Sequence, residues 1–242
     1  MHLLSIIQKI KEVNLIVLRS KTYIFMFHQV NDDRYSWKDK DCAISYKSFR
    51  NFVDKIIKKG INVCNLRDDL EALKKNGNTD MRAFITFDDA YSDVYYKCFP
   101  ILKEKALPFT VFLAEGLIGT KGYLEDYMIR EMIDSGLCIV GSHTVNHLML
   151  RKQTEDVVNW EMTESKRRLE ERFSVNIDLL AYPYGSIYAC SRQNIKSARR
   201  AGYRLAFSTL NGSLPRRFDR WRYFIPRINV NEKKCEKILE KI

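Results

Sequence analysis

Residues 83–89 read AFITFDD, an apolar run that ends in two adjacent carboxylates, Asp88 and Asp89. A continuous apolar run is typical of a strand buried on both faces, as in a parallel sheet. Two neighbouring carboxylates repel each other and are costly to bury unless a cation lies between them. The stretch therefore predicts a buried parallel strand whose end can hold a cation. The alternative is that one Asp caps the next helix, although Ser92 and Asp93 are better placed for that role.

Apolar strands and helical segments alternate on both sides of this stretch. Further strands are expected at residues 23–30, 61–65, 109–113, 137–142, 178–182 and 204–208. Helices are expected at residues 45–59, 66–75, 92–105, 123–135, 154–173, 191–201 and 231–242. This alternation predicts an α/β fold, and favours a parallel barrel of the eight-strand or slightly deformed type over an open sheet. Such barrels carry their chemistry at the C-terminal ends of the strands.

Two of the four histidines of the chain follow another expected strand end, where residues 142–147 read SHTVNH. His143 and His147 are four residues apart, and on a helical turn this spacing points both imidazoles in the same direction. With Asp89 they offer two nitrogens and one oxygen to a cation, and leave open positions for water and substrate as in a catalytic zinc site. The same set suits ferrous iron, so the identity of the metal stays open. Two histidines satisfied by backbone hydrogen bonds are the alternative.

A third motif, AYPYG at residues 181–185, follows the next expected strand. Pro183 and Gly185 predict a tight turn. Such a turn can aim a backbone N–H into the cleft, where it would stabilise an oxyanion. An ordinary connection between strand and helix is the alternative.

The three motifs, in this order, resemble those of the polysaccharide deacetylase family, carbohydrate esterase family 4, over about residues 22–230. The resemblance implies a deformed (β/α)7-type barrel that removes N-acetyl groups from amino-sugar polymers. It implies that Asp88 is the general base, and that Asp89, His143 and His147 hold a divalent metal. The expected metal is Zn²⁺, with Co²⁺, Ni²⁺ and Fe²⁺ as alternatives. The backbone N–H of Tyr184 would then help to stabilise the oxyanion.

Three positions depart from the usual pattern of that family. Ala90 stands where the family has Gly, which matters if the position needs a positive φ. Ala181 stands where an Arg is usual. No His follows His147, although a later His serves as general acid in many members.

Two residues are candidates to fill these gaps. His28 follows the first expected strand, so barrel geometry points it to the same mouth, where it would act as an acid or orient the substrate. Near a C-terminal strand, Arg227, in preference to Arg220 or Arg222, would pair with Asp88 and hold it ionised. The alternatives are a buried His with a backbone partner and a solvated basic face. Tyr182 and Tyr184 are candidates for stacking on sugar faces, although aromatic residues near a turn are often part of the core.

Composition and charge restrict the remaining choices. The chain has 242 residues, 45% of them hydrophobic, which excludes disorder for the bulk of it. The net charge of +11 favours phosphate-bearing substrates or anionic lipids, and no nucleic-acid-binding motif is present. The six cysteines show no C-x-x-C spacing, which favours reduced, buried thiols.

Two segments are expected along the chain. Residues 1–21 have the pattern of an amphipathic helix, packed on the domain or lying on a membrane surface, and residues 22–242 would form the catalytic domain. No signal peptide is recognised, so we expect a cytoplasmic location, at the inner face of the membrane. The expected partner is an amino-sugar glycan or a lipid- or nucleotide-linked sugar, without nucleic acid. Alternative functions are deformylation of a lipid-linked amino sugar and carbohydrate binding without catalysis.

Overall fold

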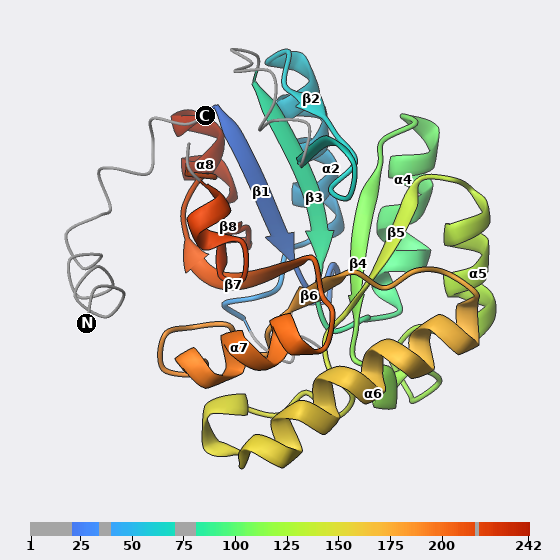
Figure 1. The fold of residues 1–242 in the computed structure, drawn as a ribbon. Helices are drawn as coiled ribbons and strands as arrows, with labels where there is room; N and C mark the ends of the chain where they lie inside the picture. The colour runs from blue at the N-terminus through green and yellow to red at the C-terminus, as the bar shows by residue number, and fades with distance from the viewer. Residues whose placement is uncertain (1–20, 34–39, 71–80, 216–217) are drawn as a thin grey trace.

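The computed structural model describes residues 21–33, 40–70, 81–215 and 218–242. Within these residues eight strands form one parallel sheet at the centre of the molecule (Figure 1). The strands are β1 (Thr22–Phe27), β2 (Asn62–Val63), β3 (Arg82–Phe87), β4 (Phe109–Leu113), β5 (Cys138–Ser142), β6 (Leu179–Ala181), β7 (Leu205–Asn211) and β8 (Ile225–Asn229). The sequence thus located the first seven strands, most of them with longer bounds than the structure shows.

The sheet closes into a barrel because β1 pairs with both β3 and β8. Along its other edge, β3 pairs with β2 through residues 82–83 and with β4 through residues 86–87. On this side of β3, the short β2 therefore pairs with the amino-terminal half of the strand and β4 pairs with the carboxyl-terminal half. The closed ring consists of β1 and β3–β8, which is the deformed (β/α)7-type barrel that the sequence predicted.

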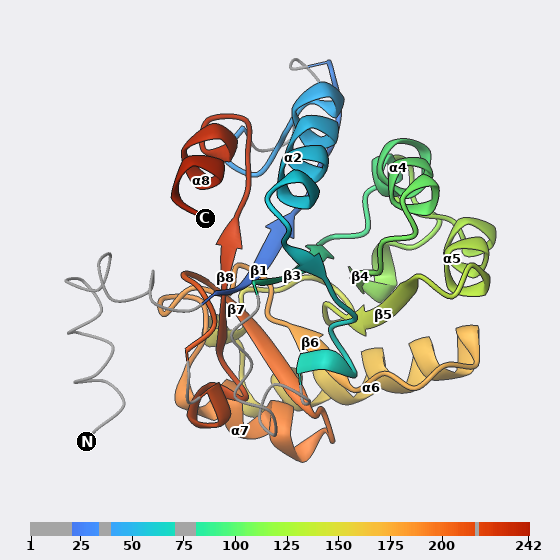
Figure 2. The ribbon, with the colours of Figure 1, turned by 90° about the horizontal axis from the view of Figure 1, so that it is seen from above.

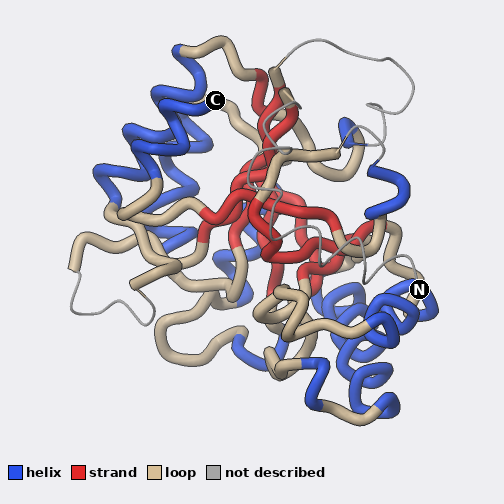
Figure 3. The backbone as a smooth tube through the Cα atoms, turned by 90° about the vertical axis from the view of Figure 1, so that its left-hand side faces the viewer, coloured by secondary structure: helices blue, strands red, loops and turns tan. Residues whose placement is uncertain are grey.

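Helices surround the strands, as Figures 2 and 3 show from two further directions. The α-helices are α2 (Tyr46–Lys58), α4 (Phe99–Glu104), α5 (Asp126–Asp134), α6 (Glu155–Phe173), α7 (Arg192–Arg200) and α8 (Cys235–Lys241). Short helical turns are η3 (Val94–Cys98), η4 (Glu115–Leu117), η5 (Leu150–Lys152) and η6 (Phe218–Trp221). Ser45, Thr154 and Ser191 cap α2, α6 and α7 by accepting hydrogen bonds from backbone N–H groups of the first turn, so these helices begin where the sequence indicated.

Two helices and one strand show the clearest differences from the sequence-based expectation. The helix expected at 92–105 is divided into the π-helical turn η3 and α4, because Pro100 has no N–H and fits only the first turn of a helix. The helix expected from residue 231 begins only at Cys235. β8 had no expected bounds, because Pro226 and Arg227 interrupt its apolar pattern.

Side chains of the strands alternate between two hydrophobic layers. One layer fills the barrel, and its strand residues include Ile24, Phe84, Phe112, Phe207 and Ile225. The other faces the helices: Phe25 and Phe27 pack edge-on against Phe52 of α2. The barrel is therefore filled with side chains, and only its carboxyl end is left for a site.

Several expectations fall outside the described residues. They are the amphipathic helix over residues 1–20 and the second half of the helix expected at 66–75. Among the helices that the structure does describe, none has the length and apolar character required to cross a bilayer. Of the six cysteines, Cys42 and Cys138 are partly exposed and the other four are buried.

Candidate active site

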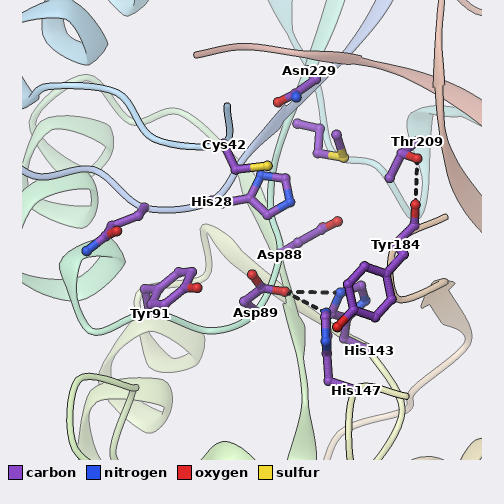
Figure 4. Close-up of a pocket in the computed structure, with 12 residues that line it drawn as sticks. His28, Cys42, Asp88, Asp89, Tyr91, His143, His147, Tyr184, Thr209 and Asn229 are labelled. Carbon is purple, nitrogen blue, oxygen red and sulfur yellow. Dashed lines mark hydrogen bonds and ion pairs between the residues drawn. The ribbon is translucent and has the colours of Figure 1, made fainter. Parts of the chain in front are cut away.

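A pocket of about 300 Å³ lies at the carboxyl ends of the strands (Figure 4). It is bounded by the turn after β3, the loop after β5 and the turn after β6, which contain the three sequence motifs. The residues that line it are Met26, His28, Gln29, Cys42, Asp88, Asp89, Tyr91, His143, His147, Tyr184, Thr209 and Asn229. The barrel thus brings together residues that are up to about 200 positions apart in the chain.

Asp89, His143 and His147 converge on one point of this pocket. Oδ1 of Asp89 lies 3.3 Å from Nε2 of His143 and 3.1 Å from Nε2 of His147. Atoms that bind Zn²⁺ tetrahedrally at about 2.0–2.1 Å are separated from one another by about 3.3 Å. The three side chains therefore fit a shared divalent cation, and their ligand atoms all lie within 4.8 Å of one another.

The buried imidazole of His143 is oriented by the backbone. Its Nδ1 lies 2.8 Å from the carbonyl oxygen of Ala181 and donates a hydrogen bond to it, so Nε2 is the nitrogen that faces Asp89: it is a donor when the ring is charged and a metal ligand when the ring is neutral. Burial lowers the pKa of His143, but the hydrogen bond to Asp89 and the charges of Asp88 and Asp89 outweigh burial and raise it. The surroundings of this ring thus favour a positive charge, as a cation site requires.

Asp88 points away from Asp89 and into the barrel. Nη1 and Nη2 of Arg227 donate to its two carboxylate oxygens at 2.7 and 2.6 Å, and both side chains are almost completely buried. Burial alone would raise the pKa of Asp88, but the charge and hydrogen bonds of Arg227 outweigh burial and lower it. The pairing that the sequence predicted is confirmed, and it keeps the carboxylate ionised.

Backbone geometry separates the two carboxylates. Asp89 and Ala90 both lie in the left-handed region, with φ of 69° and 66°. A non-glycine residue there costs roughly 1–2 kcal/mol. The departure at Ala90 therefore matters, because this position does need a positive φ.

The family model described as polysaccharide deacetylase matches residues 75–206, more than half of the chain. The chain belongs to the polysaccharide deacetylase family.

Two curated relatives have sequences similar to this one. The putative polysaccharide deacetylase YxkH of Bacillus subtilis is 32% identical over 147 residues, which cover 61% of this chain and 50% of that protein. The poly-beta-1,6-N-acetyl-D-glucosamine N-deacetylase of Staphylococcus aureus is 24% identical over 216 residues, 84% of this chain and 72% of that protein. The chain thus spans only about half the length of YxkH.

Several solved structures have the same fold as this chain. The deacetylase PplD of Streptococcus pyogenes, in complex with acetate, has a TM-score of 0.79 at 24% identity, covering 91% of this chain and 97% of that one. IcaB from Ammonifex degensii also has a TM-score of 0.79, at 23% identity, covering 91% and 96%. At these identities the similarity demonstrates the barrel, and the roles of individual residues depend on the geometry above.

The loop that carries the two histidines differs from the expected helical turn. Thr144 and His147 adopt positive φ values of 66° and 54°, so the segment is an irregular loop. The rings of His143 and His147 nevertheless lie 4.9 Å apart, centroid to centroid. The expected convergence is correct, but its cause is two left-handed residues and not helical spacing.

The turn at residues 183–185 is tight, as expected, and it is fixed against β7. The Thr209 backbone N–H donates to the Gly185 carbonyl at 3.0 Å, and the Thr209 hydroxyl donates to the Tyr184 carbonyl at 2.9 Å. A Cβ on Gly185 would lie 2.6 Å from the Thr209 nitrogen, so no larger residue fits. Tyr184 is 52% exposed, and its ring lies 4.9 Å from that of His147.

Tyr182 is not part of the pocket, and its expected contact with sugar is wrong. Its side chain is fully buried, and its hydroxyl donates to the carbonyl of Tyr223 at 2.9 Å. Because side chains alternate along the chain, Ala181 faces the barrel interior and Tyr182 faces the helices.

Other pocket residues were not expected from the sequence. Asn229 lies two positions after Arg227 on β8 and therefore on the same face, a signal that was available once the strand was known. Tyr91 stacks on Tyr123 with ring centroids 5.2 Å apart. Cys42 also lines the pocket (Figure 4).

Proposed function

We propose that this chain is a metal-dependent hydrolase that removes N-acetyl groups from an amino-sugar glycan. The observation that carries the proposal is the Asp89–His143–His147 set beside Asp88, which Arg227 holds ionised. A binding protein needs only the first three residues. A second carboxylate, placed next to the cation site but bound to a different partner, is what a hydrolase needs as a general base.

Each residue of the site has a distinct task in amide hydrolysis. The divalent cation, Zn²⁺ with Co²⁺, Ni²⁺ and Fe²⁺ as alternatives, would act as a Lewis acid toward water and the acyl carbonyl. Asp88 accepts the proton of the attacking water. The backbone N–H of Tyr184, presented by the turn that Gly185 and Thr209 hold, donates to the developing oxyanion.

His28 is the proposed proton donor to the leaving amine. It lines the pocket, and its Nδ1 is buried without a hydrogen-bond partner in the part of the chain that the structure describes. Buried polar atoms usually have a hydrogen-bond partner, so the unpartnered Nδ1 supports a functional role for this ring. General acid catalysis contributes typically about 10²–10⁴-fold, so we expect His28→Gln to lose at least about 10²-fold in kcat.

The proposed substrate is a polymer or precursor that contains N-acetylglucosamine. The staphylococcal relative is named for such a polymer, and the exposed ring of Tyr184 beside the cation site offers a face for a sugar to pack on. The net charge of +11 supports a phosphate-bearing or membrane-associated form, such as a lipid- or nucleotide-linked sugar. A cytoplasmic location at the inner membrane face is part of this proposal.

The test is acetate release from β-1,6-linked N-acetylglucosamine oligomers by protein stripped of metal and reloaded with Zn²⁺. N-formylated oligomers serve as the second substrate. If the protein releases formate but no acetate, the activity is deformylation and not deacetylation. Asp88→Asn should bind metal normally and lose turnover. If wild type and Asp88→Asn bind the metal fully and neither releases acetate or formate, the chain is a carbohydrate-binding homologue and the proposal is wrong.

A further inference from the structure

Glu161 is a fully buried carboxylate in the middle of α6, outside the barrel. The buried side chains around it on the same helix face are Val158, Met162, Ser165 and Leu169. A carboxylate in such surroundings is strongly destabilising unless it is hydrogen-bonded. Its hydrogen-bond partners therefore indicate why it is there.

All three hydrogen bonds that Glu161 accepts come from the segment between the two histidines. Its Oε2 accepts from the backbone N–H groups of Val145 and Asn146, each at 2.9 Å. Its Oε1 accepts from the side-chain amide of Asn146 at 2.7 Å. The carboxylate thus binds the two central residues of the loop that joins His143 to His147.

This loop is strained, so it depends on such contacts. Thr144 is β-branched, and both Thr144 and His147 have positive φ, at roughly 1–2 kcal/mol each. Strained backbone of this kind persists only where its surroundings over-determine it. Neutral contacts contribute as well: Thr144 N–H donates to the Ser142 hydroxyl at 3.1 Å, and Ser142 is hydrogen-bonded to Ser165 at 2.7 Å.

We propose that Glu161 is a positioning residue that holds residues 143–147 in the conformation in which both imidazoles face Asp89. It thereby sets the affinity of the site for its divalent cation. Glu161 does not line the pocket. Its hydrogen bonds to the loop come from the backbone N–H groups of Val145 and Asn146 and from the side chain of Asn146. The inference rests on the cation site of the proposed function.

The test is the dissociation constant for Zn²⁺, measured on chelator-stripped protein by competition with a chromophoric chelator. Loss of a group that orients metal ligands typically weakens binding about 10–100-fold, which we expect for Glu161→Gln. The matched control is Glu164→Gln, one turn further along α6, where the carboxylate is partly exposed and is paired with Arg167 and Arg168. It should change the dissociation constant less than about twofold.

The visible spectrum of the Co²⁺-loaded protein is a second readout that a purely structural role would not move. We expect Glu161→Gln to alter the d–d bands, because the imidazoles take up a less defined geometry. If Glu161→Gln lowers the melting temperature of the metal-free protein but leaves the Zn²⁺ affinity and the Co²⁺ spectrum unchanged, the inference is overturned.

A second variant keeps the inference testable if Glu161→Gln fails to fold. Asn146→Ala removes one of the three hydrogen bonds at an exposed position, and should weaken Zn²⁺ binding several-fold. An unchanged affinity in a folded Asn146→Ala would count against Glu161. The failure of the proposed function would look different, because wild type would then bind Zn²⁺ but release neither acetate nor formate, whatever the affinity of the Glu161→Gln variant.

Discussion

The turn after β3 and the loop after β5 each contain two residues with positive φ, yet buried charges of opposite sign hold them. Arg227 inside the barrel binds the first through Asp88, and Glu161 outside the barrel binds the second through Val145 and Asn146. In the first case the bound group is itself proposed to take part in the reaction. In the second case the bound group is the backbone of the segment that contains the two histidine ligands. Loss of Arg227 and loss of Glu161 should therefore have different effects on the protein.

The largest expected effect is that of Arg227→Met. This change leaves Asp88 buried without its partner, which typically destabilises a protein by about 3–5 kcal/mol. Urea denaturation of the metal-free protein measures it, with Arg222→Met as the control because Arg222 is only partly buried. A loss below about 1 kcal/mol would mean that the pair contributes little to the fold.

The pH dependence of that loss identifies its origin. The pKa of Asp88 is lowered in the folded chain, so the pair stabilises the fold above the unfolded pKa of about 3.9, and this contribution disappears as the pH falls through the folded-state pKa. In Arg227→Met, burial raises the pKa instead, and the carboxyl becomes neutral in acid. The stability difference between the two proteins should therefore shrink between pH 7 and pH 3.5; a constant difference would contradict the assignment.

Metal removal tests whether the two segments form one unit. The cation would join Asp89 of the first to His143 and His147 of the second, and binding at a hundred times the dissociation constant stabilises the folded state by about 2.7 kcal/mol. Chelation should lower the melting temperature accordingly. It should also increase amide hydrogen exchange at residues 88–90 and 143–147 together, whereas exchange in only one segment would show that they are independent.

The smallest expected effect is a gain in stability. Ala90→Gly relieves a left-handed alanine and should stabilise the fold by roughly 1 kcal/mol, measured by urea denaturation. Ala201→Gly is the matched control, because Ala201 follows α7 with φ of –68° and carries no such strain. Ala201→Gly should be neutral or destabilising. A loss of stability in Ala90→Gly would show that the packing of the Ala90 methyl group contributes more free energy than the positive φ costs.

The sequence was sufficient to locate the site but not to explain how it is held. Asp88, Asp89 and the two histidines follow apolar strands, and the rule for parallel barrels places strand ends at one mouth. Arg227 was identifiable because a buried carboxylate needs a cation. These predictions need only the position of each residue at the end of its own strand and the general chemistry of charged side chains.

What the sequence did not reveal depends on contacts between distant elements. Positive φ is uncommon for non-glycine residues, and most of all for the β-branched Thr144; here contacts of the loop with α6 and β5 support it. Glu161 sits in a helix of many charges, where a single inward-facing carboxylate has no distinct pattern. Tyr182 was misassigned because β6 is only three residues long, too short for its alternation to be recognised.

The burial of Arg227 beneath Asp88 has a consequence for proton movement. Arg227 fills the axis of the barrel there, with its guanidinium 5.4 Å from the ring centre of Phe112. Among the described residues, the pocket mouth is the opening beside Asp88, and it is also where the proposed sugar substrate would bind. In the proposed reaction, a proton taken up by this carboxylate would then leave by the same opening as the products, so regeneration of the base and release of the products would share one route.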